Sequence, residues 1–166
     1  MMNLVYRQAT MADLPRIVEI YNSTIAGRMV TADTNPVTVE SRIPWFEAHH
    51  PSLRPLWMID LDGQNVGWMS FQSFYGRPAY SGTVEVSIYL AENARGKGLG
   101  KEVLHYAMKA APQFGVHTLL GFIFAHNEPS VKLFRAMGFE EWAHLPDIAI
   151  LDGEARSLKI LGYKVK

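Results

Sequence analysis

TVEVSIYLAENARGKGLGK, residues 83–101, sets a strand, a glycine-rich loop and the first turn of a helix directly after one another. In residues 83–90, valine, isoleucine and leucine alternate with glutamate, serine and tyrosine, so this strand has one apolar and one polar side. Apolar residues then recur at helical spacing over residues 99–110. A strand that feeds directly into a helix is typical of folds in which helices pack on a sheet.

The loop carries glycine at every second position, Gly96, Gly98 and Gly100. Glycine lets the backbone approach a ligand closely, and a helix start offers free N–H groups and the positive end of the helix dipole. The loop therefore predicts a phosphate or pyrophosphate site, with a glycine-rich turn that binds nothing as the alternative. Its spacing differs from two common phosphate loops. The P-loop needs glycine where Arg95 stands, and G-x-G-x-x-G needs its third glycine one residue after Gly100.

The other elements follow from periodicity and from breaker residues. Further strands are predicted at 4–8, 56–61, 65–74, 118–125, 139–145 and 157–163, with a hairpin at Asp62-Gly63. Further helices are predicted from about 10 to 22, from 38 to about 48, and from 129 or 130 to a cap at Gly138. The order β α α β β β α β α β β predicts a single domain, residues 1–166, built on a mixed α/β sheet.

Composition excludes several classes of protein. Lys plus Arg and Asp plus Glu number 16 each, so neither nucleic acid nor a membrane surface is an expected partner. The absence of cysteine excludes disulfides and thiol catalysis, and the six histidines lack ligand-like spacing, so no metal site is predicted. Residues 1–11 show no secretory signal and the apolar runs are too short to span a membrane, so a soluble cytoplasmic protein is expected.

Two motifs in the C-terminal half resemble one family. Arg95-x-x-Gly98-x-Gly100 is similar to the Gln/Arg-x-x-Gly-x-Gly/Ala signature of GNAT acetyltransferases. Further along, Asn127-Glu-Pro-Ser130 precedes a short helix that ends at Gly138-Phe139, an arrangement often found in that family. The resemblance implies the GNAT fold, a mixed sheet whose central strands splay apart, flanked by helices.

Three motifs in the rest of the chain narrow the resemblance to a branch. Ile20-Tyr21-Asn22, Arg42-Ile-Pro-Trp-Phe46 and Glu85 look like the phosphinothricin or methionine sulfoximine acetyltransferases. That branch implies a homodimer that transfers acetyl from acetyl-CoA to a small amino-acid-like amine, such as phosphinothricin, methionine sulfoximine or methionine sulfone. Two alternatives are a protein or peptide N-acetyltransferase and a GNAT-fold sensor that holds CoA without turnover.

The resemblance also implies a cofactor site. Backbone N–H groups of the loop and helix start would hold the pyrophosphate, the preceding strand would pair with the pantetheine arm, and Asn127 would hydrogen-bond that arm. The residues concerned are Ile88, Tyr89, Leu90, Arg95, Gly96, Lys97, Gly98, Leu99, Gly100, Lys101, Asn127 and Ser130. Asn127 and Ser130 have an alternative role, since an asparagine just before a helix is a common N-cap.

Glu85 is the candidate catalytic base, because the attacking amine must be neutral and a carboxylate can draw its proton. It could instead only bind the substrate ammonium, or be a solvated residue of the polar strand side. A backbone N–H near Tyr89 or Leu90 is the candidate oxyanion donor. Without cysteine to carry an acetyl group, direct attack in a ternary complex is expected.

The chain departs from the GNAT resemblance at the general acid, since Phe134 stands where many GNAT enzymes have tyrosine. The acid is then absent, or it is replaced by water, the attacking ammonium, Tyr106 or Tyr89.

Substrate contacts are predicted in two other segments. Residues 22–34 are expected to form a wall of the acceptor site, and the loop containing Phe74, Tyr75 and Arg77 is a candidate for substrate binding. Arg77 suits a carboxylate, with an exposed hairpin loop or a dimer contact as the alternative.

Overall fold

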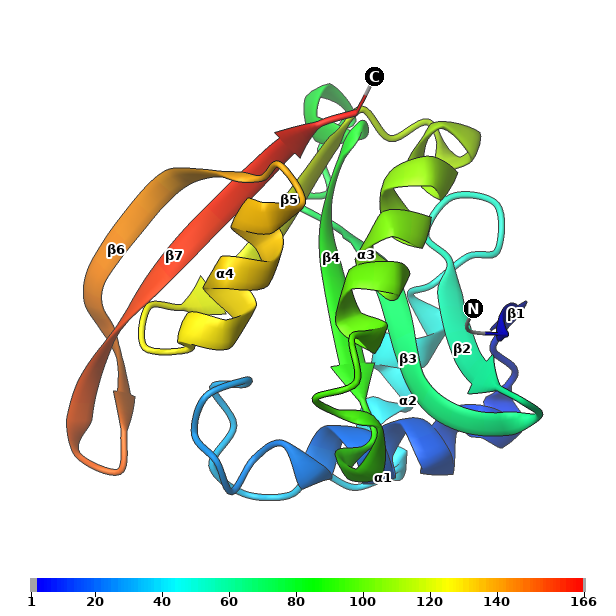
Figure 1. Cartoon of the computed structure of the whole chain (residues 1–166), viewed down its shortest axis with the longest axis horizontal. Helices are drawn as coiled ribbons and strands as arrows, with labels where there is room; N and C mark the ends of the chain where they lie inside the picture. The colour runs from blue at the N-terminus through cyan, green and yellow to red at the C-terminus, as the bar shows by residue number, and fades with distance from the viewer. Residues whose placement is uncertain (1–2, 166) are drawn as a thin grey trace.

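One mixed sheet runs through residues 3–165, the part of the chain that the computed structural model describes (Figure 1). Its seven strands lie in the order β1-β2-β3-β4-β5-β7-β6, antiparallel except for β4 and β5. They are β1 (Leu4–Gln8), β2 (Leu56–Leu61), β3 (Gln64–Ser73), β4 (Thr83–Leu90), β5 (Thr118–Phe124), β6 (Glu140–Leu151) and β7 (Glu154–Lys164). The helices are α1 (Leu14–Ser23), α2 (Ile43–Glu47), α3 (Leu99–Ala110) and α4 (Glu128–Ala136). The predicted element order and mixed sheet are confirmed.

The helices bury both faces of the sheet, and each face has its own apolar core. On one face, α3 and α4 pack through Val103, Leu104 and Phe134 against side chains of β3, β4 and β5. On the other, α1 buries Leu14 and Ile17 against β2 and β3, with α2 at the margin. The alternation read from residues 83–90 fits this arrangement: the valines of β4 join the first core, and the polar side faces α1 and α2.

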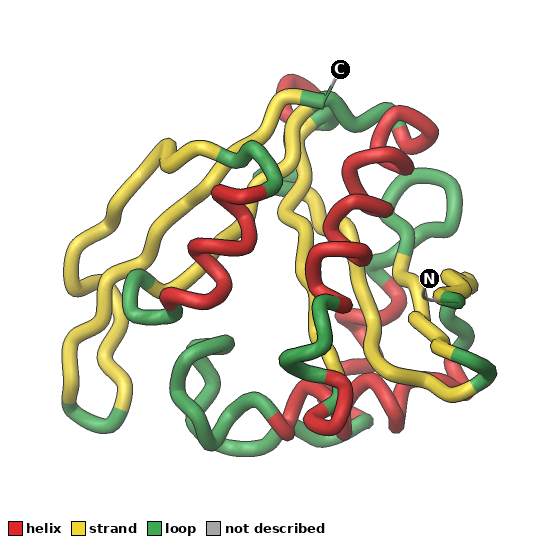
Figure 2. The backbone as a smooth tube through the Cα atoms, in the orientation of Figure 1, coloured by secondary structure: helices red, strands yellow, loops and turns green. Residues whose placement is uncertain are grey.

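The two central strands are paired for only part of their length. β4 and β5 are in register over Thr83–Glu85 and Thr118–Leu120, and beyond these residues they diverge (Figure 2). Each strand remains fully paired on its other side, β4 with β3 and β5 with β7. The sheet therefore opens at its centre, and the edge of β4 that faces β5 has no strand partner over residues 86–90.

The expected helix at 38–48 is wrong in extent. A 3-10 turn at Glu40–Arg42 precedes a five-residue α2, and Pro44 lies in its first turn, where a missing N–H does no harm. The last two strands are longer than expected. They continue past bulges in β6 to a turn at Asp152-Gly153, where both residues have positive φ. An edge strand tolerates Pro146 and bulges because one of its sides is unpaired.

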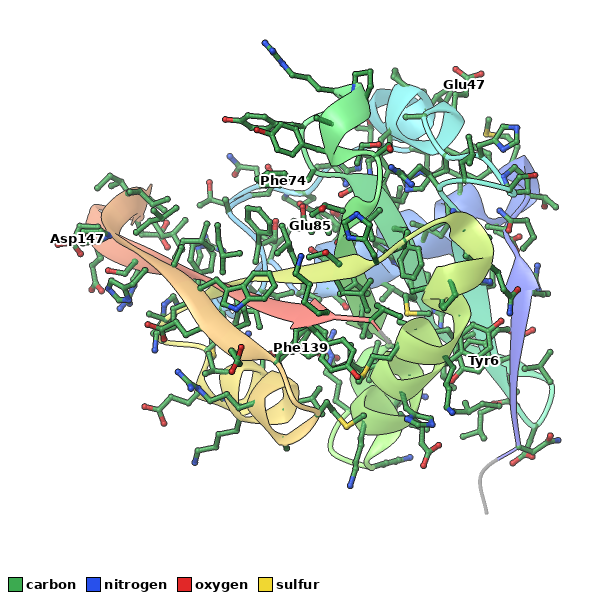
Figure 3. All side chains as sticks on the ribbon, turned by 90° about the horizontal axis from the view of Figure 1, so that it is seen from above. Tyr6, Glu47, Phe74, Glu85, Phe139 and Asp147 are labelled. Atoms are coloured by element: carbon green, nitrogen blue, oxygen red, sulfur yellow. The ribbon has the colours of Figure 1, made fainter. Side chains whose placement is uncertain are left out.

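The two edges of the sheet lie far apart, with the polar side of β4 between them. Figure 3 shows Tyr6 of β1 at one end of the molecule, Asp147 of β6 at the other, and Glu85 in the interior. Glu85 therefore lies where the two halves of the sheet meet.

Gly67→Ala is expected to destabilise the protein. A Cβ at Gly67 would lie 2.5 Å from the carbonyl oxygen of Tyr89 and 2.9 Å from Leu90 Cδ2, so strand backbone would have to move. We expect the free energy of unfolding in urea titrations to fall by about 1–3 kcal/mol. Gly27→Ala is the matched control, since its Cβ would meet no atom within 4 Å. Equal stability of the two variants would contradict this packing.

Candidate active site

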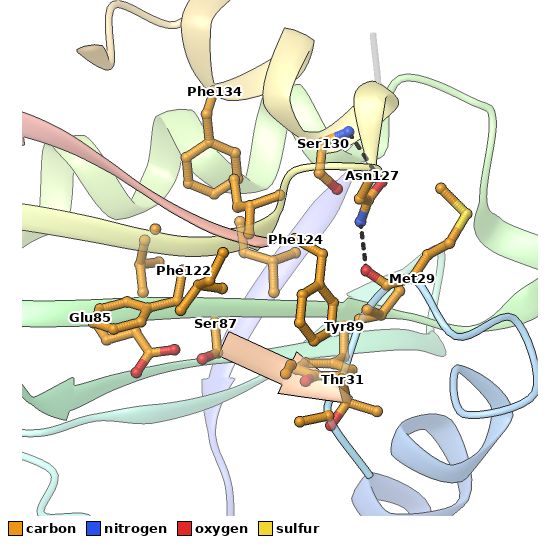
Figure 4. A pocket seen from close by; sticks show the side chains of 18 of the residues that line it. Met29, Thr31, Glu85, Ser87, Tyr89, Phe122, Phe124, Asn127, Ser130 and Phe134 are labelled. Carbon is orange, nitrogen blue, oxygen red and sulfur yellow. Dashed lines mark hydrogen bonds between the residues drawn. The ribbon is translucent and has the colours of Figure 1, made fainter. Parts of the chain in front are cut away.

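A cavity of about 380 Å³ fills the gap between β4 and β5 (Figure 4). β4 supplies one wall with Glu85, Ser87 and Tyr89, β5 and α4 supply a second, and the segment after α1 supplies a third. Residues lining the cavity include Met29, Thr31, Ile88, Gly121, Phe122, Phe124, Asn127, Ser130 and Phe134. Of the predicted site residues, the structure thus brings together Glu85, Ile88, Tyr89, Asn127 and Ser130.

The glycine loop lies at the far end of β4 from the paired residues. Gly96 and Gly98 have φ of 75° and 79°, a left-handed conformation that favours glycine, and Gly98 is the N-cap of α3. Neither a side chain nor a backbone carbonyl among residues 3–165 caps the first-turn N–H groups of Leu99, Gly100 and Lys101. The loop therefore presents unpaired donors at a helix start, which is the arrangement that binds anions.

Arg95 has a structural role in this loop. Its guanidinium donates to the Leu90 carbonyl at 3.1 Å and to Ser23 Oγ at 2.9 Å, which joins the end of β4 to the end of α1. Lys97 and Leu99 line a separate hollow with Asp62 and residues of β3, outside the cavity between β4 and β5. The predicted loop residues therefore lie together, beyond the opposite end of β4 from Glu85.

Asn127 is the N-cap of α4, and it also anchors a distant segment. Its Oδ1 accepts from Ser130 N at 3.4 Å, and its Nδ2 donates to the Met29 carbonyl at 3.2 Å (Figure 4). The N-cap interpretation is thus confirmed, while a contact to a ligand stays a prediction. Asn127 is buried and lines the cavity, so its side chain holds the cavity wall together.

The segment 28–33 is fixed across the opening by contacts from three sides. His126 Nε2 donates to the Arg28 carbonyl at 2.8 Å, and the Arg28 guanidinium pairs with Asp152 at 2.6 Å, on the β6–β7 turn. The Tyr21 hydroxyl bonds Thr31 Oγ1 at 2.6 Å and also contacts Asp33. Residues 29–32 of the predicted segment 22–34 line the cavity, while its role as a wall of the acceptor site stays a prediction.

Glu85 lies between two cavities and has no partner for its charge. Among residues 3–165 its carboxylate makes neither a hydrogen bond nor an ion pair. Burial raises the pKa of the Glu85 carboxyl above its ordinary value, because the charged form loses hydration. A carboxylate whose pKa is raised in this way is a better proton acceptor than one in water.

The second cavity lies on the α1/α2 side of the sheet and has a volume of about 250 Å³. Its lining comprises Tyr21, Arg42, Trp45, Trp68, Ser70, Gln72, Glu85, Ser87 and Tyr89. No role was predicted from the sequence for Trp68, Ser70 or Gln72. A signal for two of them was present, since Ser70 and Gln72 stand at alternate positions and therefore share one side of the strand.

The aromatic loop of Phe74, Tyr75 and Arg77 lies outside both cavities. Phe74 packs towards Phe122, with ring centroids 6.4 Å apart, and so borders the first cavity from outside. The Tyr75 side chain is 68% exposed, and Arg77 is also exposed. The loop is thus an exposed hairpin loop in the single chain, and a role for it in substrate binding stays a prediction.

The candidates for a general acid are separated by the structure. Phe134 is buried at the first cavity and packs on Gly121, where a Cβ would be 2.6 Å from its ring. Tyr106 stacks on Tyr6 at 3.7 Å, in the core beneath α3 and away from both cavities. Tyr89 lines both cavities, stacked on Trp68 at 4.6 Å, and burial raises the pKa of its hydroxyl. Of the two tyrosines considered as the general acid, Tyr89 is therefore the one that lines the cavities.

Residues 3–165 contain neither a cluster of metal-binding side chains nor a helix that could span a membrane. No three His, Asp or Glu side chains within residues 3–165 gather in a way that could hold a metal ion. None of the helices in the same range has the length and hydropathy to cross a membrane.

Comparisons with known proteins agree with this architecture. Residues 17–139 match the acetyltransferase (GNAT) family. YwnH of Bacillus subtilis (strain 168), provisionally named a phosphinothricin acetyltransferase, is 53% identical over 98% of this chain and 99% of its own. An L-methionine sulfoximine/L-methionine sulfone acetyltransferase of Pseudomonas paraeruginosa is 32% identical over 89% of this chain and 86% of its own.

A solved structure shows the same fold with a ligand bound. The phosphinothricin acetyltransferase of Sinorhizobium meliloti in complex with acetyl-CoA superposes with a TM-score of 0.90 at 27% identity. The match covers 99% of this chain and 89% of that one. The fold, the glycine loop and the match over most of the chain establish that this protein belongs to the GNAT family of acetyltransferases.

Proposed function

We propose that this acetyltransferase moves the acetyl group of acetyl-CoA to the primary amine of a small amino-acid-like acceptor. The observation that carries the proposal is the position of Glu85, an unpaired carboxylate shared by a cavity at the free edge of β4 and a second cavity behind it. The names of the relatives support phosphinothricin, methionine sulfoximine and methionine sulfone as acceptors.

The co-substrate fits unsatisfied backbone groups in the sheet and the loop. The free edge of β4 over 86–90 offers N–H and C=O groups to the amides of the pantetheine arm. The first-turn N–H groups of α3, beyond left-handed Gly96 and Gly98, would hold the pyrophosphate. Asn127 and Ser130 lie along the path between them, at the opposite wall.

The chemistry follows from the groups at the junction of the cavities. The acceptor nitrogen attacks the thioester carbonyl, its proton passes to Glu85 directly or through water, and the C–S bond breaks to release the CoA thiolate. A backbone N–H of β4 near Tyr89 stabilises the oxyanion. Phe134 has no ionisable proton, so the thiolate leaves without its help, and Tyr89 is the tyrosine that lines the same cavity.

The proposal extends to the assembly and location of the enzyme. It is a homodimer in the cytoplasm, by analogy with its branch. The exposed pair Tyr75 and Tyr80, with ring centroids 5.6 Å apart, are candidates for contact between copies. A peptide acetyltransferase and a CoA-binding sensor are the competing functions, and the first measurement distinguishes them.

CoA release from acetyl-CoA, read with a thiol reagent, tests the function directly. The chain has no cysteine, so the enzyme contributes no background. We expect release with methionine sulfone, methionine sulfoximine and phosphinothricin, and none with a peptide amine. Release with the peptide alone would move the assignment to protein acetylation. Acetyl-CoA binding without release for any acceptor would favour the sensor.

Glu85→Gln is expected to lower kcat by about 100-fold or more, because the amine loses its base. In the wild type, kcat/KM should rise with pH until the Glu85 carboxyl ionises, and its raised pKa places that limb above the ordinary range. The variant should lack this limb, while its KM for acetyl-CoA stays unchanged. Glu140→Gln, on exposed β6, is the control. A variant with wild-type kcat at every pH would exclude Glu85 as the base.

Gly98→Ala is expected to raise KM for acetyl-CoA by about 10-fold, since alanine disfavours φ of 79° and the loop backbone must shift. The kcat should change little. Gly115→Ala is a matched control with φ of 69° and open space around it, outside both cavities. It carries similar backbone strain, so an equal rise in KM there would show that strain alone, and not pyrophosphate binding, is responsible.

A further inference from the structure

The second cavity contains a cation without a counterion. Arg42 is half-buried, and its guanidinium carbon lies 4.7 Å from the ring centroid of Tyr21 and 5.0 Å from that of Trp45. No acidic side chain among residues 3–165 pairs with it, and its guanidinium donates to no acceptor in that range. The flat faces of a guanidinium can stack on aromatic rings and hold it in place. Its N–H donors point outward in the guanidinium plane, so they stay available for a ligand.

The same cavity contains buried donors that also lack partners. Ser70 is fully buried, and its hydroxyl has no hydrogen bond within the described chain. Trp68 is 2% exposed, and its Nε1 is likewise unpaired. Buried polar atoms in native proteins are nearly always satisfied, so two orphans in one cavity point to a polar occupant.

The opposite end of the cavity carries an acidic acceptor in place of basic and neutral donors. Glu85 lines it, supplies an acceptor and has a raised pKa through burial. The cavity therefore places a guanidinium and neutral donors at one end and a carboxylate at the other, between walls formed by Tyr21, Trp45 and Tyr89. This polarity matches a free α-amino acid, whose carboxylate and amine are adjacent.

We propose that the second cavity binds the α-carboxylate of the acceptor, and that Arg42 is the residue that selects free α-amino acids over peptides and plain amines. The inference rests on the proposed acetyl transfer, and it goes further by naming the recognition group. If the acceptor carboxylate pairs with the N–H donors of Arg42, the acceptor amine lies towards Glu85, which takes its proton. An amidated or peptide-linked acceptor offers Arg42 a neutral carbonyl, and so loses the charged pair.

The structure favours Arg42 over Arg77 for this role. Arg77 lines neither cavity within the chain, so a carboxylate that it held would lie outside both. Arg42 is half-buried among apolar rings, where a charge-assisted hydrogen bond is stronger. The sequence motif that contains Arg42 did not reveal this, because its function depends on three segments that meet only in the fold.

A titration of tryptophan fluorescence tests the proposal without requiring turnover, since Trp45 and Trp68 line the cavity. The probes are methionine sulfone and its carboxamide, which differ only in the carboxylate. We expect the wild type to bind the free acid about 10-fold or more tightly than the amide. Arg42→Gln should weaken binding of the acid by about 10- to 100-fold and leave the amide within about 3-fold.

Two further variants make the result specific. Arg42→Lys keeps the charge without the planar fork, so it should lie between the wild type and Arg42→Gln. Arg135→Gln, on exposed α4 beside Glu141, should bind like the wild type. In the CoA-release assay, Arg42→Gln should raise KM for methionine sulfone with little change in kcat, and an unchanged KM for acetyl-CoA shows that the variant is folded.

Two outcomes would overturn the proposal, and a third would separate it from the proposed acetyl transfer. Equal weakening of acid and amide in Arg42→Gln would show that Arg42 only supports the fold. An acid-selective loss in Arg77→Gln, with none in Arg42→Gln, would assign the carboxylate to the loop of Arg77. Acid-selective binding through Arg42 with no CoA release would instead keep the carboxylate site and refute acetyl transfer, so the two failures are distinct.

Discussion

Three residues of β4 pair with three of β5, and from there the two central strands part. In a closed sheet, the next residues would satisfy each other's N–H and C=O groups. Here the diverging strands expose a run of backbone donors and acceptors in the interior, and something other than a strand has to satisfy them. β3 and β7 hold β4 and β5 rigidly from outside, so the gap is a fixed property of the sheet.

The position of Glu85 follows from the same divergence. It is the last residue of β4 that pairs with β5, so it lies at the apex of the opening. Because its side chain points to the α1/α2 face, it reaches the second cavity as well as the first. Burial at that junction raises its pKa, and no cation among residues 3–165 forms an ion pair with it. A carboxylate is thus placed where two separate cavities meet.

Much of this architecture could be predicted from local pattern. The bounds of β4 and α3 agree with the sequence because each has a strong period and clear breakers: alternation before Ala91, glycines at the start of the helix and Pro112 after it. The extent of α2 and of β6 could not be predicted in this way. Pro44 shortens one, and the other continues past Pro146 only because it lies at the edge of the sheet. Edge position is a tertiary property that a single sequence does not state.

The residues of the candidate site also differ in whether local sequence or the fold brings them together. Glu85 and the glycine loop lie close together in the chain, next to a strand and a helix start, so the sequence named them as candidates. Arg42, Trp68 and Ser70 acquire theirs by meeting across α2 and β3, and no spacing along the chain predicts that meeting. Arg77 shows the converse, a residue of suitable chemistry that the fold leaves at the surface.

Segment 28–33 is held in place by a different kind of contact from the strands around it. Its links are a few hydrogen bonds and the ion pair of Arg28 with Asp152, each small by itself, and none belongs to a strand pair. Loosening it would leave every ladder of the sheet intact. The first cavity is thus bounded by paired strands on one side and by a segment held through single contacts on another, so its width can change at segment 28–33 without the loss of any strand pair.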